Sequence, residues 1–157
     1  MDKLSILFDL FGKVVISNVV ADECVLDLSR PGAVHIKKAM DKGKIEINNK
    51  RVAGELSESV DMLGAGEVSA IKLALINKIP LLIDEKLGRR AAEKLNIKII
   101  GTVGVLLLAK RRKCIDKISP LIDTLTENGY RLSQKLIRDV LVLARETHGK
   151  NLSTQDY

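Results

Sequence analysis

Four acidic side chains occupy positions from which they could act together. Glu23 lies shortly after the apolar segment 13–17. Glu67 opens a run of mostly small and apolar residues, and Asp84 and Glu85 directly follow another apolar segment. If both segments are strands of an open parallel sheet, the acids gather at the carboxyl edge where such sheets bind ligands. Clustered carboxylates repel one another, and Mg²⁺ or Mn²⁺ would relieve that repulsion and assist phosphodiester chemistry.

Each acid also has a simpler explanation. Glu67 could interact favourably with the dipole of the helix that it opens. Asp84 could be the N-cap of the helix that follows it. Glu23 could be an ordinary solvated helix residue. Only their common placement at one sheet edge makes a shared metal site competitive with these readings.

Basic side chains provide a second candidate surface. The chain holds 26 Lys and Arg against 20 Asp and Glu, a formal charge of +6 that favours polyanionic partners such as nucleic acid. With only two Phe, two Tyr and no Trp, base stacking and sequence-specific single-strand reading are disfavoured. The alternatives are helix-dipole interactions and a solvated surface. The candidate phosphate contacts are Lys86, Arg89, Arg90, Lys110, Arg111 and Arg112.

The elements that must position these residues alternate between helix and short apolar strand. This pattern is typical of βαβ units, and it predicts a three-layer α/β/α fold with a central parallel sheet and additional C-terminal helices. We expect one domain over residues 1–148 and a polar tail over 149–157. The expected helices are 4–11, 19–28, 31–43, 67–77, 87–95, 103–113, 118–127 and 133–147, and the expected strands are 13–17, 45–52, 80–83 and 97–101.

Some classes of protein are disfavoured. Cys24 and Cys114 lie far apart in apolar segments, and His35 and His148 are isolated, so no zinc-site spacing exists. The longest apolar stretches are too short to span a bilayer, and the N-terminus does not have the pattern of a signal peptide. We expect a soluble cytoplasmic protein without membrane contact.

Several segments in order resemble one known group. They are GAGE at 64–67, LLIDEK at 81–86, IGTVGVLL at 100–107, LID at 121–123 and GYRLS at 129–133. Together they are similar to a poorly characterised prokaryotic family related to PIN-domain, VapC-type nucleases, over about residues 4 to 146. The ordered series is far more specific than any single segment.

The resemblance implies a function and a set of site residues. PIN domains are metal-dependent ribonucleases, and many are toxins paired with an antitoxin protein. Glu23 then matches the acid after the second strand, and Glu67 matches the acid that opens the following helix. The last acid is Asp84 in one register and Glu85 in another. The resemblance thus implies Mg²⁺ or Mn²⁺ as cofactor and RNA as substrate.

One feature of the family has no counterpart in the residues given. PIN domains begin with a strand ending in a metal-binding Asp, whereas this sequence begins with the helix that follows that strand. Two hypotheses therefore remain open, a PIN-type ribonuclease and a non-catalytic module that binds nucleic acid or protein. We also expect self-association, because a second chain would cover the apolar surface that the first strand covers in other PIN domains.

Overall fold

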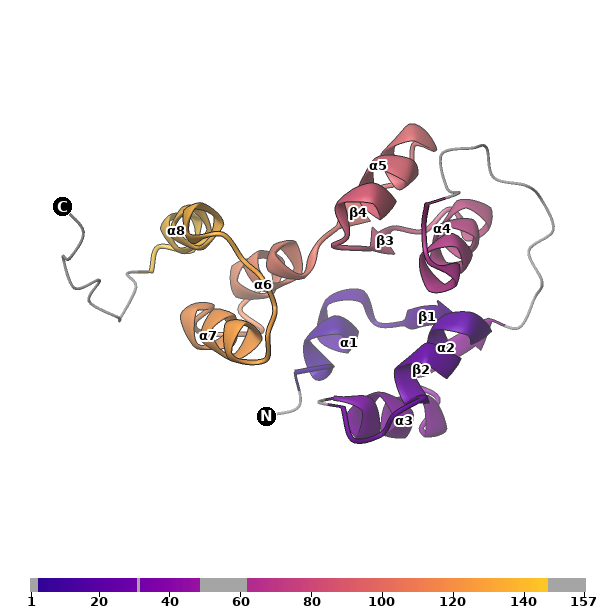
Figure 1. Ribbon diagram of the computed structural model, residues 1–157. Coiled ribbons are helices and arrows are strands. Elements are labelled where there is room, and N and C mark those ends of the chain that lie inside the picture. The colour runs from indigo at the N-terminus through magenta and orange to yellow at the C-terminus, as the bar shows by residue number, and fades with distance from the viewer. Residues whose placement is uncertain (1–2, 31, 49–61, 147–157) are drawn as a thin grey trace. The chain divides into compact units, whose positions relative to one another are not determined.

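The computed structural model describes residues 3–30, 32–48 and 62–146. It divides into two compact units, Met1–Val105 and Leu106–Tyr157, and each is described by itself. Both consist mainly of helices, and the strands lie in the first unit (Figure 1).

The first unit begins with a parallel pair of strands. Helix α1 (Ser5–Phe11) ends at Gly12, which adopts a φ of 71°. Strand β1 (Val14–Ser17) then pairs in parallel with β2 (Ile45–Asn48). The connection between them contains helices α2 (Asn18–Val25) and α3 (Ala33–Asp41). This crossover is the expected route between parallel strands.

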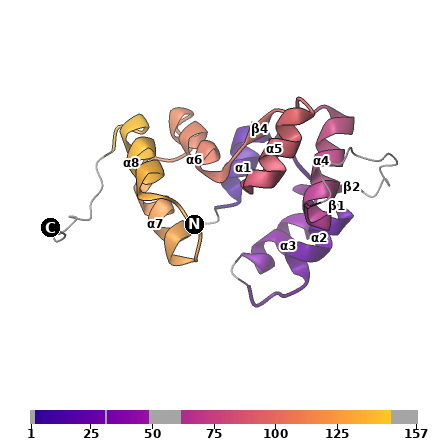
Figure 2. The same ribbon diagram turned by 45° about the horizontal axis from the view of Figure 1, so that its top comes forward.

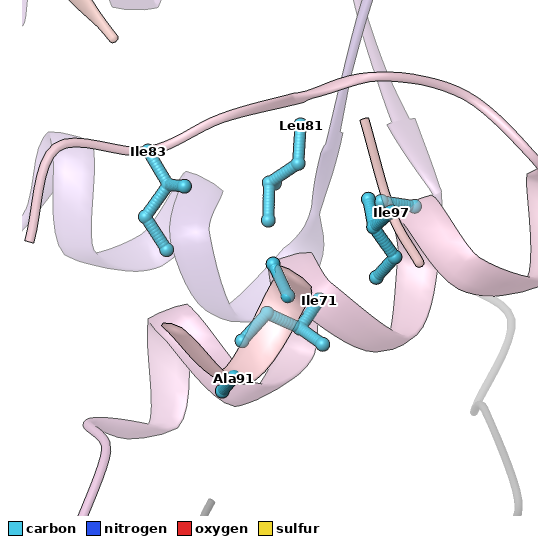
Figure 3. Packing of buried hydrophobic residues seen from close by; sticks show 7 residues of the cluster. Ile71, Leu81, Ile83, Ala91 and Ile97 are labelled. Atoms are coloured by element: carbon cyan, nitrogen blue, oxygen red, sulfur yellow. The ribbon is translucent and has the colours of Figure 1, made fainter. Parts of the chain in front are cut away.

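A second parallel pair follows helix α4 (Ala65–Asn77). Strands β3 (Leu81–Leu82) and β4 (Ile99–Ile100) are connected by helix α5 (Lys86–Lys94). The packed interior is aliphatic, with Ile71, Leu81, Ile83, Ala91 and Ile97 among its buried members (Figure 3). Helix α4 contacts both β1 and β3, so it packs against one strand of each pair.

The second unit is helical. Helix α6 (Thr102–Arg111) runs into it from the first unit, and α7 (Ser119–Glu127) and α8 (Gln134–Leu143) follow. Glu146 joins these elements, because its carboxylate pairs with Lys110 and accepts hydrogen bonds from the N–H groups of Ile118 (2.7 Å) and Ser119 (3.0 Å).

The α/β class and the parallel strand pairing are confirmed, and every predicted helix is present. The strands are shorter than expected, however, and the described residues form two separate pairs instead of one continuous sheet. The strand predicted over 45–52 is present as β2, and its last residues lie outside the described part of the chain, as does the tail 149–157. Cys24 and Cys114 are both free thiols and half-buried.

Candidate acidic site

Helix α2, which carries Glu23, packs against α4 and is joined to it by a short hydrogen-bonded network (Figures 1 and 2). Ser17 is buried and caps α2, its Oγ accepting from the Val20 N–H at 3.2 Å. The Ser17 and Ser69 hydroxyls lie 2.7 Å apart, and Ser69 donates to the Gly66 carbonyl at 2.8 Å. Because Ser69 gives its proton to Gly66, Ser17 is the donor to Ser69. The network thus fixes the start of α2 against the first turn of α4.

The Glu23 carboxylate rests directly on that turn. A Cβ atom on Gly66 would lie 2.3 Å from Oε2 of Glu23 and 2.9 Å from its Oε1, far closer than real contacts allow. The carboxylate therefore occupies space that exists only because residue 66 is glycine. Burial raises the pKa of the neighbouring Cys24 thiol, and the negative charge of Glu23 raises it further.

Glu67 stands in the same turn and its two oxygens have different surroundings. Oε2 accepts a hydrogen bond from the Gly64 N–H at 3.0 Å, which satisfies one of the free donors at the start of α4. Oε1 is buried and has no hydrogen-bond partner among the residues that the structure describes. It lies against α5, 3.0 Å from where a Cβ on Gly88 would be. The helix-terminal role considered for Glu67 is thus confirmed, but it accounts for only one of the two oxygens.

Asp84 caps a different helix from the one expected. The N-cap of α5 is Glu85, so the prediction that Asp84 caps the following helix is wrong. Its Oδ1 accepts from the Thr102 N–H at 2.9 Å and its Oδ2 from the Thr102 Oγ1 at 2.6 Å. Because β3 and β4 are paired, the segment that follows β3 lies beside the helix that follows β4. Parallel pairing therefore brings Asp84 to the start of α6.

The remaining candidates surround Asp84. Glu85 is exposed and makes no side-chain cap. Arg89 is half-buried and donates to the Ile83 carbonyl at 3.2 Å. A Cβ on Gly101 would lie 2.7 Å from Oδ1 of Asp84 and 3.0 Å from Nη1 of Arg89. The Asp84 carboxylate and the Arg89 guanidinium thus both lie close to Gly101.

The structure brings Glu23 and Glu67 to the first turn of α4 and holds Asp84 at the start of a different helix, α6. Among the described residues, no three or more His, Cys, Asp or Glu side chains form a group that could hold a metal ion. The donor chemistry nevertheless fits a hard divalent cation, because all the candidate atoms are carboxylate oxygens and one of them is buried without a hydrogen bond. The assignment of Glu23, Glu67, Asp84 and Glu85 as ligands stays a prediction.

The six basic candidates belong to two groups. Lys86, Arg89 and Arg90 lie on α5, with Lys86 and Arg90 exposed. The second group lies at and after the end of α6, where Arg111 is exposed and Lys110 forms the ion pair with the 7%-exposed Glu146 side chain. Lys110 is therefore less available to a ligand than its sequence position indicates. The third member of that second group is Arg112, which is also exposed.

Comparison with protein families decides the identity of the fold. A family model described as a PIN domain matches residues 1–146. The chain belongs to the PIN-domain family. This confirms the resemblance drawn from the ordered sequence segments and the α/β class. No curated protein and no solved structure gives a significant match. No helix in the described part of this PIN domain is long and apolar enough to cross a bilayer.

Sequence reasoning missed the residues that hold the acids in place. These are Thr102, which binds Asp84, and three glycines that lie against Glu23, Glu67 and Asp84. The glycines have a recognisable signal, because each lies at the start of a helix, where a residue without a side chain permits close approach. The three glycines of this PIN domain are Gly66, Gly88 and Gly101.

Proposed function

We propose that this PIN domain is a metal-dependent endoribonuclease whose acids are Glu23, Glu67 and Asp84, with Glu85 as the alternative to Asp84. The observation that supports it best is the convergence of Glu23 and Glu67 on the first turn of α4, within a chain of the PIN family. Mg²⁺ or Mn²⁺, when bound, would supply charge neutralisation and water activation at a phosphodiester.

The protein's own contribution is to hold negative charge in place before any cation arrives. Thr102 fixes both oxygens of Asp84, and the Gly64 N–H fixes one oxygen of Glu67. Both donors stand at helix N-termini, where the macrodipole favours anions. Such pre-orientation lowers the cost of bringing repelling carboxylates together. The free oxygen of Glu67 is left for a ligand other than the backbone.

RNA is the proposed substrate, and the exposed basic residues would contact its backbone. Arg90 on α5 and Arg111 at the end of α6 are exposed. Neither is a member of the Lys37–Asp41 or the Lys110–Glu146 ion pair. Each phosphate neutralised on a single strand steepens the salt dependence of binding by about 0.7 in log–log slope. Arg90→Gln should therefore flatten that slope for single-stranded RNA by about this amount, whereas Lys42→Gln, at the C-cap of α3, should not.

The toxin role is also part of the proposal, with an antitoxin protein as partner, and it rests on the family alone. Self-association has one structural support. Among the described residues, β1 pairs only with β2 and β3 only with β4, so each outer strand has an edge able to accept another strand. Sedimentation velocity at micromolar concentration should show a dimer or larger species, and a single monomeric boundary would contradict it.

The second candidate is a non-catalytic module. This candidate is favoured because residues 3–30, 32–48 and 62–146 contain no group of three metal-binding side chains. Cleavage of end-labelled single-stranded RNA separates the two candidates. The ribonuclease should require Mn²⁺ or Mg²⁺, stop on addition of EDTA, and lose at least about a hundredfold in rate on Asp84→Asn. Metal-independent binding without cleavage would support the module instead.

A further inference from the structure

The first turn of α4 places two acids by different means. Glu67 is held by a hydrogen bond, at 3.0 Å from its Oε2 to the Gly64 nitrogen. Glu23 lies on another helix and reaches the turn from outside, with both carboxylate oxygens against Gly66. Glu23 itself is exposed, whereas Gly66 is buried beneath it. The place of the Glu23 carboxylate is therefore set by the space above Gly66.

Residue 66 is glycine where helix formation alone would favour another residue. Glycine lowers helix stability relative to alanine, and no left-handed φ requires it here. The atoms nearest to a Cβ at this position are the Oε2, Cδ and Oε1 atoms of Glu23, at 2.3, 2.9 and 2.9 Å. A single acidic side chain thus accounts for the missing Cβ.

We propose that Gly66 is a positioning residue, which holds the Glu23 carboxylate at the turn of α4 that also carries Glu67 by leaving room for it. The benefit of this placement rests on the proposed metal-dependent function. The placement itself rests only on the packing of Glu23 against Gly66. The Ser17–Ser69–Gly66 hydrogen bonds anchor the start of α2 to the same turn. Because α2 is fixed at that end, the whole helix cannot shift to compensate when the Glu23 carboxylate is displaced.

Gly66→Ala is the direct test, because the three atoms nearest to the added methyl all belong to the flexible end of Glu23. The variant should fold and melt at or slightly above the wild-type temperature, since alanine favours the helix. In the metal-free protein, the ¹³C carboxyl resonance of Glu23 should move. In calorimetric titration with Mn²⁺, the dissociation constant should rise about 10-fold to 100-fold, as when groups that orient metal ligands are altered.

A compensating change and a matched control sharpen the test. Glu23→Asp shortens the acid by one methylene, so the double variant with Gly66→Ala should recover part of the Mn²⁺ affinity. Gly104→Ala, within α6, places its methyl 3.1 Å from an Ile100 side-chain carbon and near no acid. It should leave both the Glu23 resonance and the Mn²⁺ affinity unchanged.

The outcomes separate the two proposals. An unmoved Glu23 resonance in Gly66→Ala would overturn the positioning role, whatever the metal does. Wild-type Mn²⁺ affinity in that variant, with a wild-type protein that does bind Mn²⁺, would overturn it as well. If the wild type binds no Mn²⁺ while the Glu23 resonance moves as expected, the positioning role stands and the metal-dependent function fails.

Discussion

Asp84 and Thr102 are 18 residues apart in sequence and form a two-point contact. The Thr102 N–H donates to Oδ1 at 2.9 Å, and the Thr102 hydroxyl donates to Oδ2 at 2.6 Å. With both oxygens engaged, the carboxylate is held in one orientation at the N-terminus of α6, where the helix dipole favours its charge. The contact also joins the end of β3 to the element that follows β4.

Thr102→Val tests the side-chain half of this contact. Valine keeps the shape and the backbone N–H of threonine and removes only the hydroxyl. Asp84 is exposed, so water replaces part of the lost bond, and we expect a loss of about 1 kcal/mol in the free energy of unfolding. Urea denaturation measures it.

The control for this variant is Thr124→Val in α7. The Thr124 hydroxyl donates to the Pro120 carbonyl within its own helix, an exposed contact that adds little stability. The control should change the free energy of unfolding by less than about 0.5 kcal/mol. Equal effects of the two substitutions would show that the Asp84–Thr102 bond has no special weight.

The elements of this fold could be predicted because their signals are local. Gly12 ends α1 with a positive φ, and Ser133 caps α8 by accepting from the Leu136 N–H at 3.1 Å, a role for which serine is a preferred residue type. The strands were overestimated, because an apolar run marks burial and not the extent of pairing. β3 and β4 each contain only two paired residues.

The site was only partly predictable, for a different reason. Residue type and spacing placed Glu67 at a helix start correctly. The partner of Asp84 depends on which strand lies beside β3, and the neighbour of Glu23 depends on how α2 packs against α4. Neither relation is encoded near the acid itself. A glycine at a helix start is the nearest local signal, but the sequence does not say which side chain fills its space.

Ser17→Ala should be costly for its size. The hydroxyl caps α2 and donates to Ser69, and the residue is 6% exposed, so water cannot replace both bonds. We expect a loss of about 2 kcal/mol, at the upper end for an N-cap. Ser133→Ala, an N-cap exposed to solvent, should cost about 1 kcal/mol in the same urea titration. Equal losses would argue against the Ser17–Ser69 bond.

Glu146 should make the second unit sensitive to acid. Burial raises the pKa of its carboxyl, but the hydrogen bonds from Lys110, Ile118 and Ser119 outweigh burial and lower the pKa to about 2, from an ordinary 4.5. The unfolded chain therefore binds the proton more readily. The stabilisation, on the order of 3 kcal/mol, is fully present above about pH 4.5 and is lost as the pH falls toward 2.

Glu146→Gln checks this linkage. The free energy of unfolding should fall by about 2 kcal/mol at pH 7, and its difference from wild type should shrink steadily below pH 4.5. Asp41→Asn is the control, because the Lys37–Asp41 pair is exposed and should contribute less than about 0.5 kcal/mol. A Glu146→Gln difference that stays constant from pH 7 to pH 3 would contradict the assigned pKa.

Glu67→Gln distinguishes an acid that serves a metal from one that serves only its helix. The amide oxygen can still accept from the Gly64 N–H, so the capping bond survives. If the carboxylate is one of a repelling cluster, neutralising it should leave stability unchanged or raise it by up to about 1 kcal/mol, while Mn²⁺ binding and ribonuclease activity are lost. If Glu67 only complements the helix dipole, stability should fall by a few tenths of a kcal/mol, about 0.3 to 0.5, with no effect on Mn²⁺.

Calorimetric titration of Mn²⁺ into both proteins, with thermal melts of each, separates these cases. Glu93→Gln is the control, because Glu93 is an exposed acid on α5 and is not among the candidate ligands. It should bind Mn²⁺ as the wild type does. The buried Oε1 of Glu67 explains why we expect the first case, since a helix-terminal charge alone gives no reason to bury an oxygen without a hydrogen bond. Equal Mn²⁺ binding by wild type and Glu67→Gln would remove Glu67 from the site.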